Sequence, residues 1–194
     1  MGLPAPVERE PFHQRRITVD GYRRADGLWD IEAHMTDTKS YAFSNAWRGE
    51  IAPGEALHDM WLRLTLDDAL VVRDVAAVSA AHPFRACPEI TGNFARLIGE
   101  TIGAGWSKRV RTLLGGIAGC THLVDLLGPI ATVAFQTIKS ERGRALARKS
   151  AATAPAAADK PRRRPPLIDS CHAMRADGEV VQRYWPDFST APTR

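Results

Sequence analysis

The sequence contains no apolar run approaching the roughly 20 residues that a membrane-spanning helix needs. The first residues, MGLPAPVEREPF, lack the basic stretch followed by an apolar stretch that marks a secretory signal. The chain has 3 cysteines, and an odd number without a signal argues against a disulfide framework. We therefore expect a cytoplasmic protein with reduced thiols that does not bind membranes.

Several signatures of common enzyme classes are also absent. The chain has no GxxxxGK[ST], GxGxxG or GxSxG pattern, which argues against phosphate transfer and against hydrolysis by a serine triad. It has no CxxC or HExxH pattern either, so spacing alone does not identify a metal site.

The composition is typical of a soluble globular protein, with 44% hydrophobic and 25% charged residues. The net charge is +4, and much of the excess lies in residues 139–164 while acidic and basic residues are mixed elsewhere. This distribution does not favour a groove for nucleic acid. We expect a small-molecule substrate as the partner, and a homo-oligomer is a further expectation.

Alternation of apolar and polar residues predicts two β-hairpins. The turn at Asp26-Gly27 joins the first pair of strands, and Asp67-Asp68 joins the second. The polar residues 37–55 are expected to form a long connection. The predicted strands are residues 17–23, 28–36, 58–66 and 70–78.

Apolar residues at spacings of three and four predict helices after the hairpins, at residues 90–102, at residues 106–114 and within 115–137. Gly128-Pro129 predicts a kink in the last of these rather than its end. The fold class expected is α+β, with an antiparallel sheet of two or three hairpins covered on one face by three helices.

The change of composition after the last helix predicts a division of the chain. The expected parts are a flexible tail at 1–12, a single α+β domain at 13–139, an Ala/Arg/Pro linker at 140–166, a C-terminal hairpin at 167–188 that returns to the domain, and a tail at 189–194. The alternative for the first part of the linker is that it extends the preceding helix.

Reactive side chains lie at the start of the longest helix pattern, where Cys120, Thr121 and His122 occupy the first turn. Unpaired backbone N–H groups in a first turn favour a thiolate and disfavour an imidazolium. Cys120 is thus a candidate nucleophile or metal ligand, and His122 a candidate neutral base or ligand. The alternative is that Cys120 is a small buried residue and His122 a hydrogen-bonded histidine at the edge of the core.

Other candidates are distributed along the chain. His58 should share the apolar face of its strand while Asp59 points to the other face, and Cys87 lies at a helix entrance like Cys120. Cys171 and His172 follow the linker. Three or four of these side chains together would bind zinc or iron. The predicted catalytic set is His58, Asp59, Cys120 and His122, and the predicted metal set adds Cys87, Cys171 and His172.

Five stretches resemble, nearly end to end, a bacterial family catalogued as the domain of unknown function DUF2889. They are YRRADGLWDIEAHMTDT, HDMWLRLTLDDALVVRD, FRACPEI, GCTHLVDLLGPIATVAFQT and DSCHAMRADGEVV. The resemblance implies a shared fold and a shared site, and it carries no activity.

A weaker resemblance is to scaffold proteins of iron–sulfur cluster assembly. It implies that His58-Asp59, Cys87 and Cys120-Thr121-His122 converge. The sequence departs from that pattern because His58 stands where the scaffolds have their first cysteine, and because Cys120 precedes its histidine by two positions.

Two functions follow as hypotheses. The first is a small enzyme that performs acid/base or metal-assisted chemistry, as a lyase or hydrolase, on a small aromatic or acyl compound. The alternative is a protein that handles a metal or an iron–sulfur cluster without turnover. An interaction module whose basic linker binds an acidic partner is a third hypothesis.

Overall fold

The computed structural model describes residues 2–152 and 163–192 of the chain. These residues belong to two compact units, Met1–Lys149 and Ser150–Arg194, and each is described by itself. Among the described residues, no helix has both the length and the apolar character that crossing a membrane requires.

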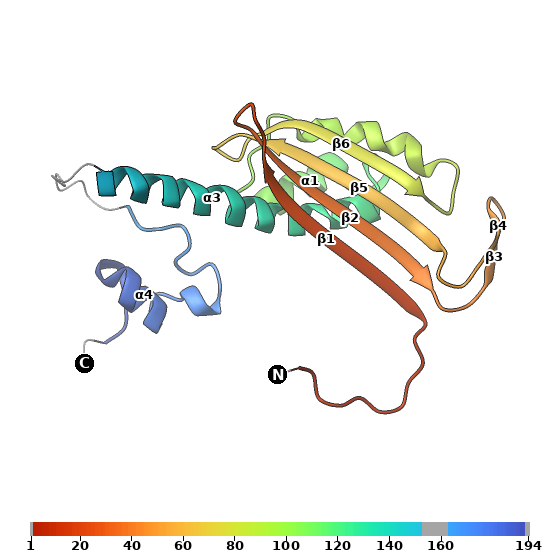
Figure 1. Ribbon diagram of the computed structural model, residues 1–194, viewed down its shortest axis with the longest axis horizontal. Coiled ribbons are helices and arrows are strands. Elements are labelled where there is room, and N and C mark those ends of the chain that lie inside the picture. Colours follow the sequence, from red (N-terminus) through yellow and green to blue (C-terminus); the bar gives the residue numbers. More distant parts are fainter. Residues whose placement is uncertain (1, 153–162, 193–194) are drawn as a thin grey trace. The chain divides into compact units, whose positions relative to one another are not determined.

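The first unit is built on an antiparallel sheet with the strand order β1-β2-β5-β6 (Figure 1). Its strands are β1 (His13–Arg23), β2 (Trp29–Lys39), β5 (Ala56–Leu66) and β6 (Val72–Ala81). Two short strands, β3 (Phe43–Asn45) and β4 (Gly49–Ile51), pair with each other within the connection between β2 and β5. The two predicted hairpins are therefore present, and β2 and β5 pair with each other at the centre of the sheet.

The alternation read from the sequence decides which face of the sheet is buried. In β2 the odd-numbered residues from Trp29 to Asp37 are buried, and in β5 the even-numbered residues from His58 to Leu66 are buried. The prediction ended the second strand at Thr36, but β2 continues to Lys39. Asp37 thus belongs to the buried face of a strand and not to a loop, because the alternation of period two continues through it.

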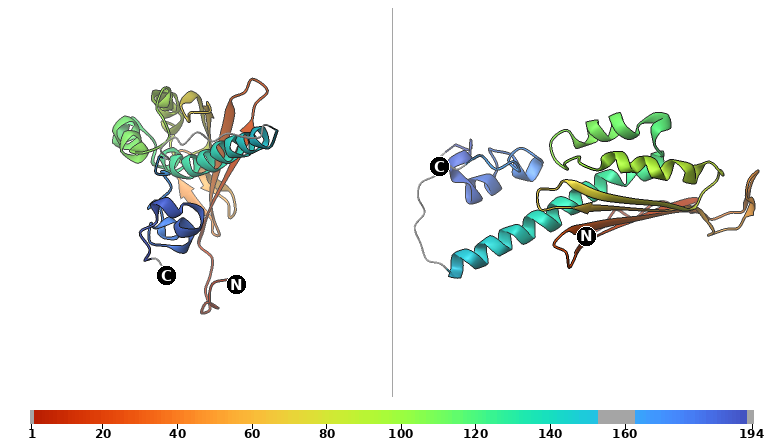
Figure 2. Two further views of the ribbon diagram at one scale, coloured as in Figure 1. Left: turned by 90° about the vertical axis from the view of Figure 1, so that its left-hand side faces the viewer. Right: turned by 90° about the horizontal axis from the view of Figure 1, so that it is seen from above.

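Helical segments cover this buried face (Figure 2). They are η1 (Cys87–Leu97), α1 (Trp106–Leu114), η2 (Gly116–Ala118), α2 (Thr121–Asp125) and α3 (Leu127–Ala152). The first of these winds as a tighter 3₁₀ helix, and the predicted kink near Gly128-Pro129 is a separation of α2 from α3 at Leu126. The α+β arrangement with helices on one face is confirmed.

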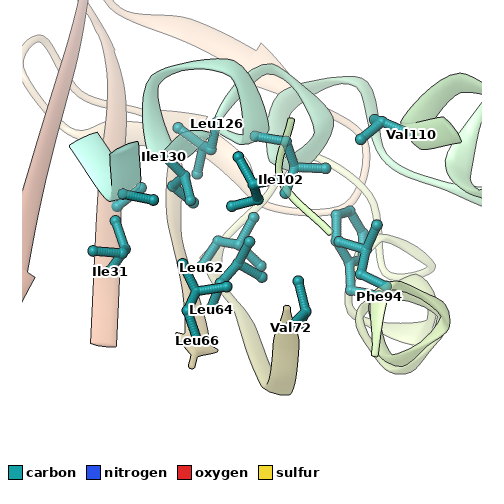
Figure 3. Close-up of a cluster of buried hydrophobic side chains, with 14 of the residues drawn as sticks. Ile31, Leu62, Leu64, Leu66, Val72, Phe94, Ile102, Val110, Leu126 and Ile130 are labelled. Carbon is teal, nitrogen blue, oxygen red and sulfur yellow. The ribbon is translucent and has the colours of Figure 1, made fainter. Parts of the chain in front are cut away.

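The core lies between the sheet and the helices (Figure 3). The cluster includes Leu62 and Leu64 of β5, Phe94 of η1, Leu126 and Ile130, all with no exposed surface. Burial of a side chain of this size contributes roughly 1.5–3 kcal/mol. This packing holds the segment around Leu126, which directly follows α2, against the inner face of the sheet.

Residues 140–152 lie in the predicted linker but continue helix α3, which was the alternative for this part of the chain. Alanine, arginine and lysine are good helix formers, so the composition that indicated a linker is also compatible with a helix. The rest of the predicted linker up to residue 162 lies outside the described residues.

Residues 167–188, predicted as a hairpin, form short helices: η3 (His172–Met174), α4 (Glu179–Tyr184) and η4 (Pro186–Phe188). The Ala176-Asp177-Gly178 turn precedes a helix rather than a second strand, and Val181 is its buried residue. The second unit contains no strand among its described residues.

Candidate functional site

Three polar side chains form a row across neighbouring strands on the buried face of the sheet. Arg15 of β1 lies opposite Asp37 of β2, and Asp37 lies opposite His58 of β5. Residues directly opposite each other in antiparallel strands share a face, so the register brings all three together. The pairing shifts just beyond this row, where Thr38 pairs with Ala56 and leaves Leu57 as the extra residue of a bulge.

Asp37 is 1% exposed, yet its carboxylate is fully hydrogen-bonded. Arg15 donates from Nε to Oδ1 at 2.8 Å and from Nη2 to Oδ2 at 2.7 Å, in a bidentate pair. His58 Nδ1 lies 3.0 Å from Oδ2, and His13 Nε2 lies 3.3 Å from Oδ1. Burial by itself would raise the pKa of Asp37, but the hydrogen bonds and charges of Arg15 and His58 outweigh it and lower that pKa.

His122, in the first turn of α2, packs against His58. The ring centroids are 3.8 Å apart and the planes are inclined by 34°. Burial lowers the pKa of His58, and the neighbouring His122 lowers it further against the opposing effect of Asp37. Burial also lowers the pKa of His122, followed by the charge of Arg15. Both imidazoles are therefore neutral at pH 7 and able to accept a proton or bind a metal.

Cys120 is the residue that precedes α2, and its Sγ lies 3.9 Å from Nδ1 of His122. Gly119 makes the tight entry to this helix, because a Cβ at that position would collide with the carbonyl oxygen of Leu114. Cys120 also lines a cavity of about 460 Å³. Because Cys120 contacts His122, it lies between this cavity and the pair of imidazoles. The other lining residues are Phe84, Ala86, Cys87, Ile90, Ile117 and Gly119.

Ligand atoms of Asp37, His58 and His122 all lie within 4.8 Å of one another. Two imidazole nitrogens and one carboxylate oxygen form a donor set that suits zinc or iron(II). Asp37 would have to release part of its hydrogen bonding to serve as a ligand, since a carboxylate has about four lone-pair positions and four donors already lie around them.

Residues 13–136 match the model of a family described as "Protein of unknown function (DUF2889)". The chain belongs to this family. The resemblance to DUF2889 read from the sequence is therefore confirmed for residues 13–136, while the stretch DSCHAMRADGEVV lies outside the match. No curated protein and no solved structure shows a significant match to the chain.

The DUF2889 match contains Arg15, Asp37, His58, Cys120 and His122. It ends within α3, so Cys171 and His172 lie outside the matched residues and in the second unit. There Cys171 is exposed, and His172 Nε2 lies 3.2 Å from Nη1 of Arg175. The group of ligand residues found among the described residues consists of Asp37, His58 and His122 and includes neither of these two.

Asp59, predicted as a partner of His58, lies on the opposite face of the DUF2889 sheet. Its Oδ1 is 2.9 Å from Nε2 of His34, whose ring stacks on Trp61 with centroids 3.7 Å apart. Consecutive side chains in a strand point to opposite faces, so His58 and Asp59 do not converge. The carboxylate beside His58 is Asp37. Cys87 shares the cavity of Cys120 and is not among the three grouped ligand residues.

Sequence reasoning missed Arg15, Asp37 and His13. The signal for Asp37 was present, because Trp29, Ile31, Ala33 and Met35 define an apolar row and Asp37 is the next member of it. A charged residue in a buried row demands a partner of opposite charge. The sequence offered no comparable signal for Arg15, which is one of several arginines near the N-terminus.

Proposed function

We propose that the protein is an enzyme that hydrolyses or cleaves a small acyl or aromatic compound, with His58 and His122 as the groups that transfer protons. One observation carries the proposal: two neutral imidazoles are in contact beside a buried carboxylate, and one of them meets a thiol at the wall of a cavity. Neutral imidazoles are effective general bases near neutral pH.

Asp37 is proposed to position His58. With Asp37 ionised, Nδ1 of His58 carries the hydrogen and donates it to Oδ2, which leaves the lone pair on Nε2. When Nε2 accepts a proton, the carboxylate stabilises the imidazolium that forms. Arg15 keeps Asp37 ionised and oriented through its bidentate pair, so it acts on the reaction through Asp37.

Cys120 is proposed as the nucleophile, which favours hydrolysis over the lyase reaction. Its thiol gives a proton to His122, and the sulfur attacks the carbonyl carbon of the substrate. The bond from that carbon to the leaving group then breaks, and the leaving group takes the proton from His122. Water, deprotonated by an imidazole, releases the acid from Cys120 and restores the thiol.

The cavity supports an acyl or aryl group as the part of the substrate that is bound. Its lining side chains are apolar or thiols, and none of them is charged. A volume of about 460 Å³ lies within the range of roughly 300–1,000 Å³ that ligand pockets occupy. A compound whose reactive carbonyl lies near Cys120 would place its apolar part against Phe84, Ile90 and Ile117.

A metal-assisted reaction is the second candidate, supported by the grouping of Asp37, His58 and His122. Zinc or iron bound there would activate water or polarise a carbonyl. Iron–sulfur clusters are held mainly by cysteine thiolates, and among the described residues of the first unit Cys120 is the thiol next to the imidazoles. The donor set therefore favours a single ion over a cluster.

The test uses an activated ester, p-nitrophenyl acetate, because acylation can be detected without knowledge of the natural substrate. We expect intact-mass spectrometry and peptide mapping to find an acetyl group on Cys120. His122→Ala and His58→Ala should each slow its formation by roughly 10²-fold while the far-UV circular dichroism is unchanged. His34→Ala is the matched control, since His34 also pairs with an aspartate but lies on the other face.

Acylation that is insensitive to His122→Ala, or that falls on Cys87 or Cys171, would contradict the nucleophile assignment. Elemental analysis of the same proteins distinguishes the metal candidate. If a metal-assisted reaction is correct, zinc or iron should be present near one ion per chain in the wild type and in His34→Ala, and lost in His58→Ala and His122→Ala.

A further inference from the structure

Strand β1 forms an edge of the main sheet along its full length (Figure 1). No other strand of the described residues pairs with its outward side. The opposite edge strand, β6, is different, because the segment after η1 hydrogen-bonds to its start. The backbone of Val72 bonds to Gly99 and Glu100, and Val71 bridges to Thr101.

The sequence of β1 lacks two of the usual protections of an exposed edge, which are a short strand and an interrupting proline. β1 spans 11 residues without proline. Its charged residues are Arg15, Arg16, Asp20 and Arg23, so a carboxylate lies on the same face as Arg16. Two of its large apolar side chains are exposed, Ile17 at 39% and Tyr22 at 50%.

We propose that β1 pairs with β1 of a second copy of this chain, antiparallel and about a two-fold axis at Thr18. In this register Arg16 lies opposite Asp20 of the second copy, and the symmetry makes this ion pair twice. Ile17 lies opposite Val19 of the second copy, which covers both apolar side chains. Opposed residues share a face in this register, so both helical layers lie on the same side of one continuous sheet.

Charge selects this register over its neighbours. With the axis at Arg16 or at Asp20, like charges would face each other across the axis. With the axis at Val19, Arg15 would oppose Arg23 of the second copy. With the axis at Ile17, Arg16 would oppose Thr18 and the ion pair would be lost. Like charges directly opposite in a sheet are destabilising, and opposite charges are favourable.

Arg16 and Asp20 are available for this contact, because both are exposed and neither forms an ion pair within the described residues. Arg15, on the same strand, points to the other face and is already bound to Asp37 and Asp125. The dimer therefore leaves the candidate site intact. It also braces the strand that supplies Arg15 and His13 to Asp37.

The first test is sedimentation equilibrium at low salt on the full chain with four sequences. We expect the wild type to form a dimer, and Arg16→Asp and Asp20→Arg each to raise the dissociation constant at least tenfold, because each places two repulsive pairs in the interface. The double variant Arg16→Asp/Asp20→Arg reverses both charges and should recover the affinity of the wild type.

The second test is crosslinking in a background in which Cys87, Cys120 and Cys171 are serine. Thr18→Cys faces its own copy across the axis, so mild oxidation should give a covalent dimer. Arg16→Cys and Asp20→Cys should crosslink poorly alone and efficiently when mixed. A monomeric wild type, a dimer indifferent to both charge reversals, or failure of Thr18→Cys to crosslink would each overturn the proposal.

Discussion

The carboxylate of Asp37, on β2, contacts side chains of both neighbouring strands, because Arg15 and His13 come from β1 and His58 comes from β5. Arg15 supplies the charge that a buried carboxylate requires, and the hydrogen bond between Asp37 and His58 fixes the orientation of the His58 ring. Asp37 therefore has a structural role and a chemical role. A single substitution tests both, because stability and the pKa of His58 are measured separately.

Asp37→Asn should lower stability by an amount near the low end of the roughly 3–5 kcal/mol that breaking a buried ion pair costs, because Arg15 is still one-third exposed. It should also lower the pKa of His58, since the charge of Asp37 raises that pKa. Urea unfolding and NMR titration of His58 measure the two effects. Asp59→Asn, on the partly buried His34 pair of the opposite face, is the control and should change stability by less than about 1 kcal/mol.

The two buried imidazoles make stability depend on pH. Burial lowers the pKa of both His58 and His122 below the usual 6.5, so the unfolded chain binds protons more readily than the folded chain. Their contribution to stability is complete above pH 6.5 and decreases as the pH falls toward the lower folded-state values. The lowered pKa of Asp37 adds a separate loss that begins below its usual 3.8.

Urea midpoints at pH 7.5, 6.5 and 5.5 should therefore decline for the wild type. His122→Gln should flatten that decline, because it removes one of the groups that protonate on unfolding. A decline of equal slope in His122→Gln would show that His122 does not titrate with a lowered pKa.

At the scale of the elements, the central strands and α1 were predicted because their apolar residues keep one period without interruption. Asp37 was assigned to a loop because the interpretation stopped at the first polar stretch. The end of a strand depends on pairing with a neighbour, and a local pattern does not contain that information. The contact of α2 with β5, which joins His122 to His58, depends likewise on how the helical layer packs across the sheet.

Packing between β1 and α3 gives a prediction about these elements. A Cβ at Gly21 would lie 2.5 Å from Oγ1 and 3.2 Å from Cβ of Thr137. Gly21→Ala should thus destabilise the protein by about 1–3 kcal/mol through overpacking. Thr137→Ala should recover most of this loss in the double variant. Gly92→Ala, where nothing lies within 4 Å, is the control for the substitution itself.

At the scale of the whole molecule, the family match and the candidate site occupy the same unit, Met1–Lys149. The sequence indicated a change of composition near residue 140, but composition alone did not distinguish a linker from a helix made of good helix formers. The second unit was misread for a related reason. Its few apolar residues fit both the period of a helix, about 3.6 residues, and the period of a strand, two residues. Tertiary packing therefore decides between helix and hairpin.

The division into two units predicts that the first folds without the second. Ile138 is the last residue of its core cluster, and every member of the candidate site precedes it. A chain ending at Lys149 should unfold cooperatively within about 3 °C of the full protein, since it keeps the whole core cluster of the first unit. It should also retain acylation of Cys120. The control ends at Leu126 and removes four buried residues of α3, Leu127, Ile130, Ala134 and Ile138, so it should not fold. Loss of cooperative unfolding in the longer chain would show that the second unit supports the first.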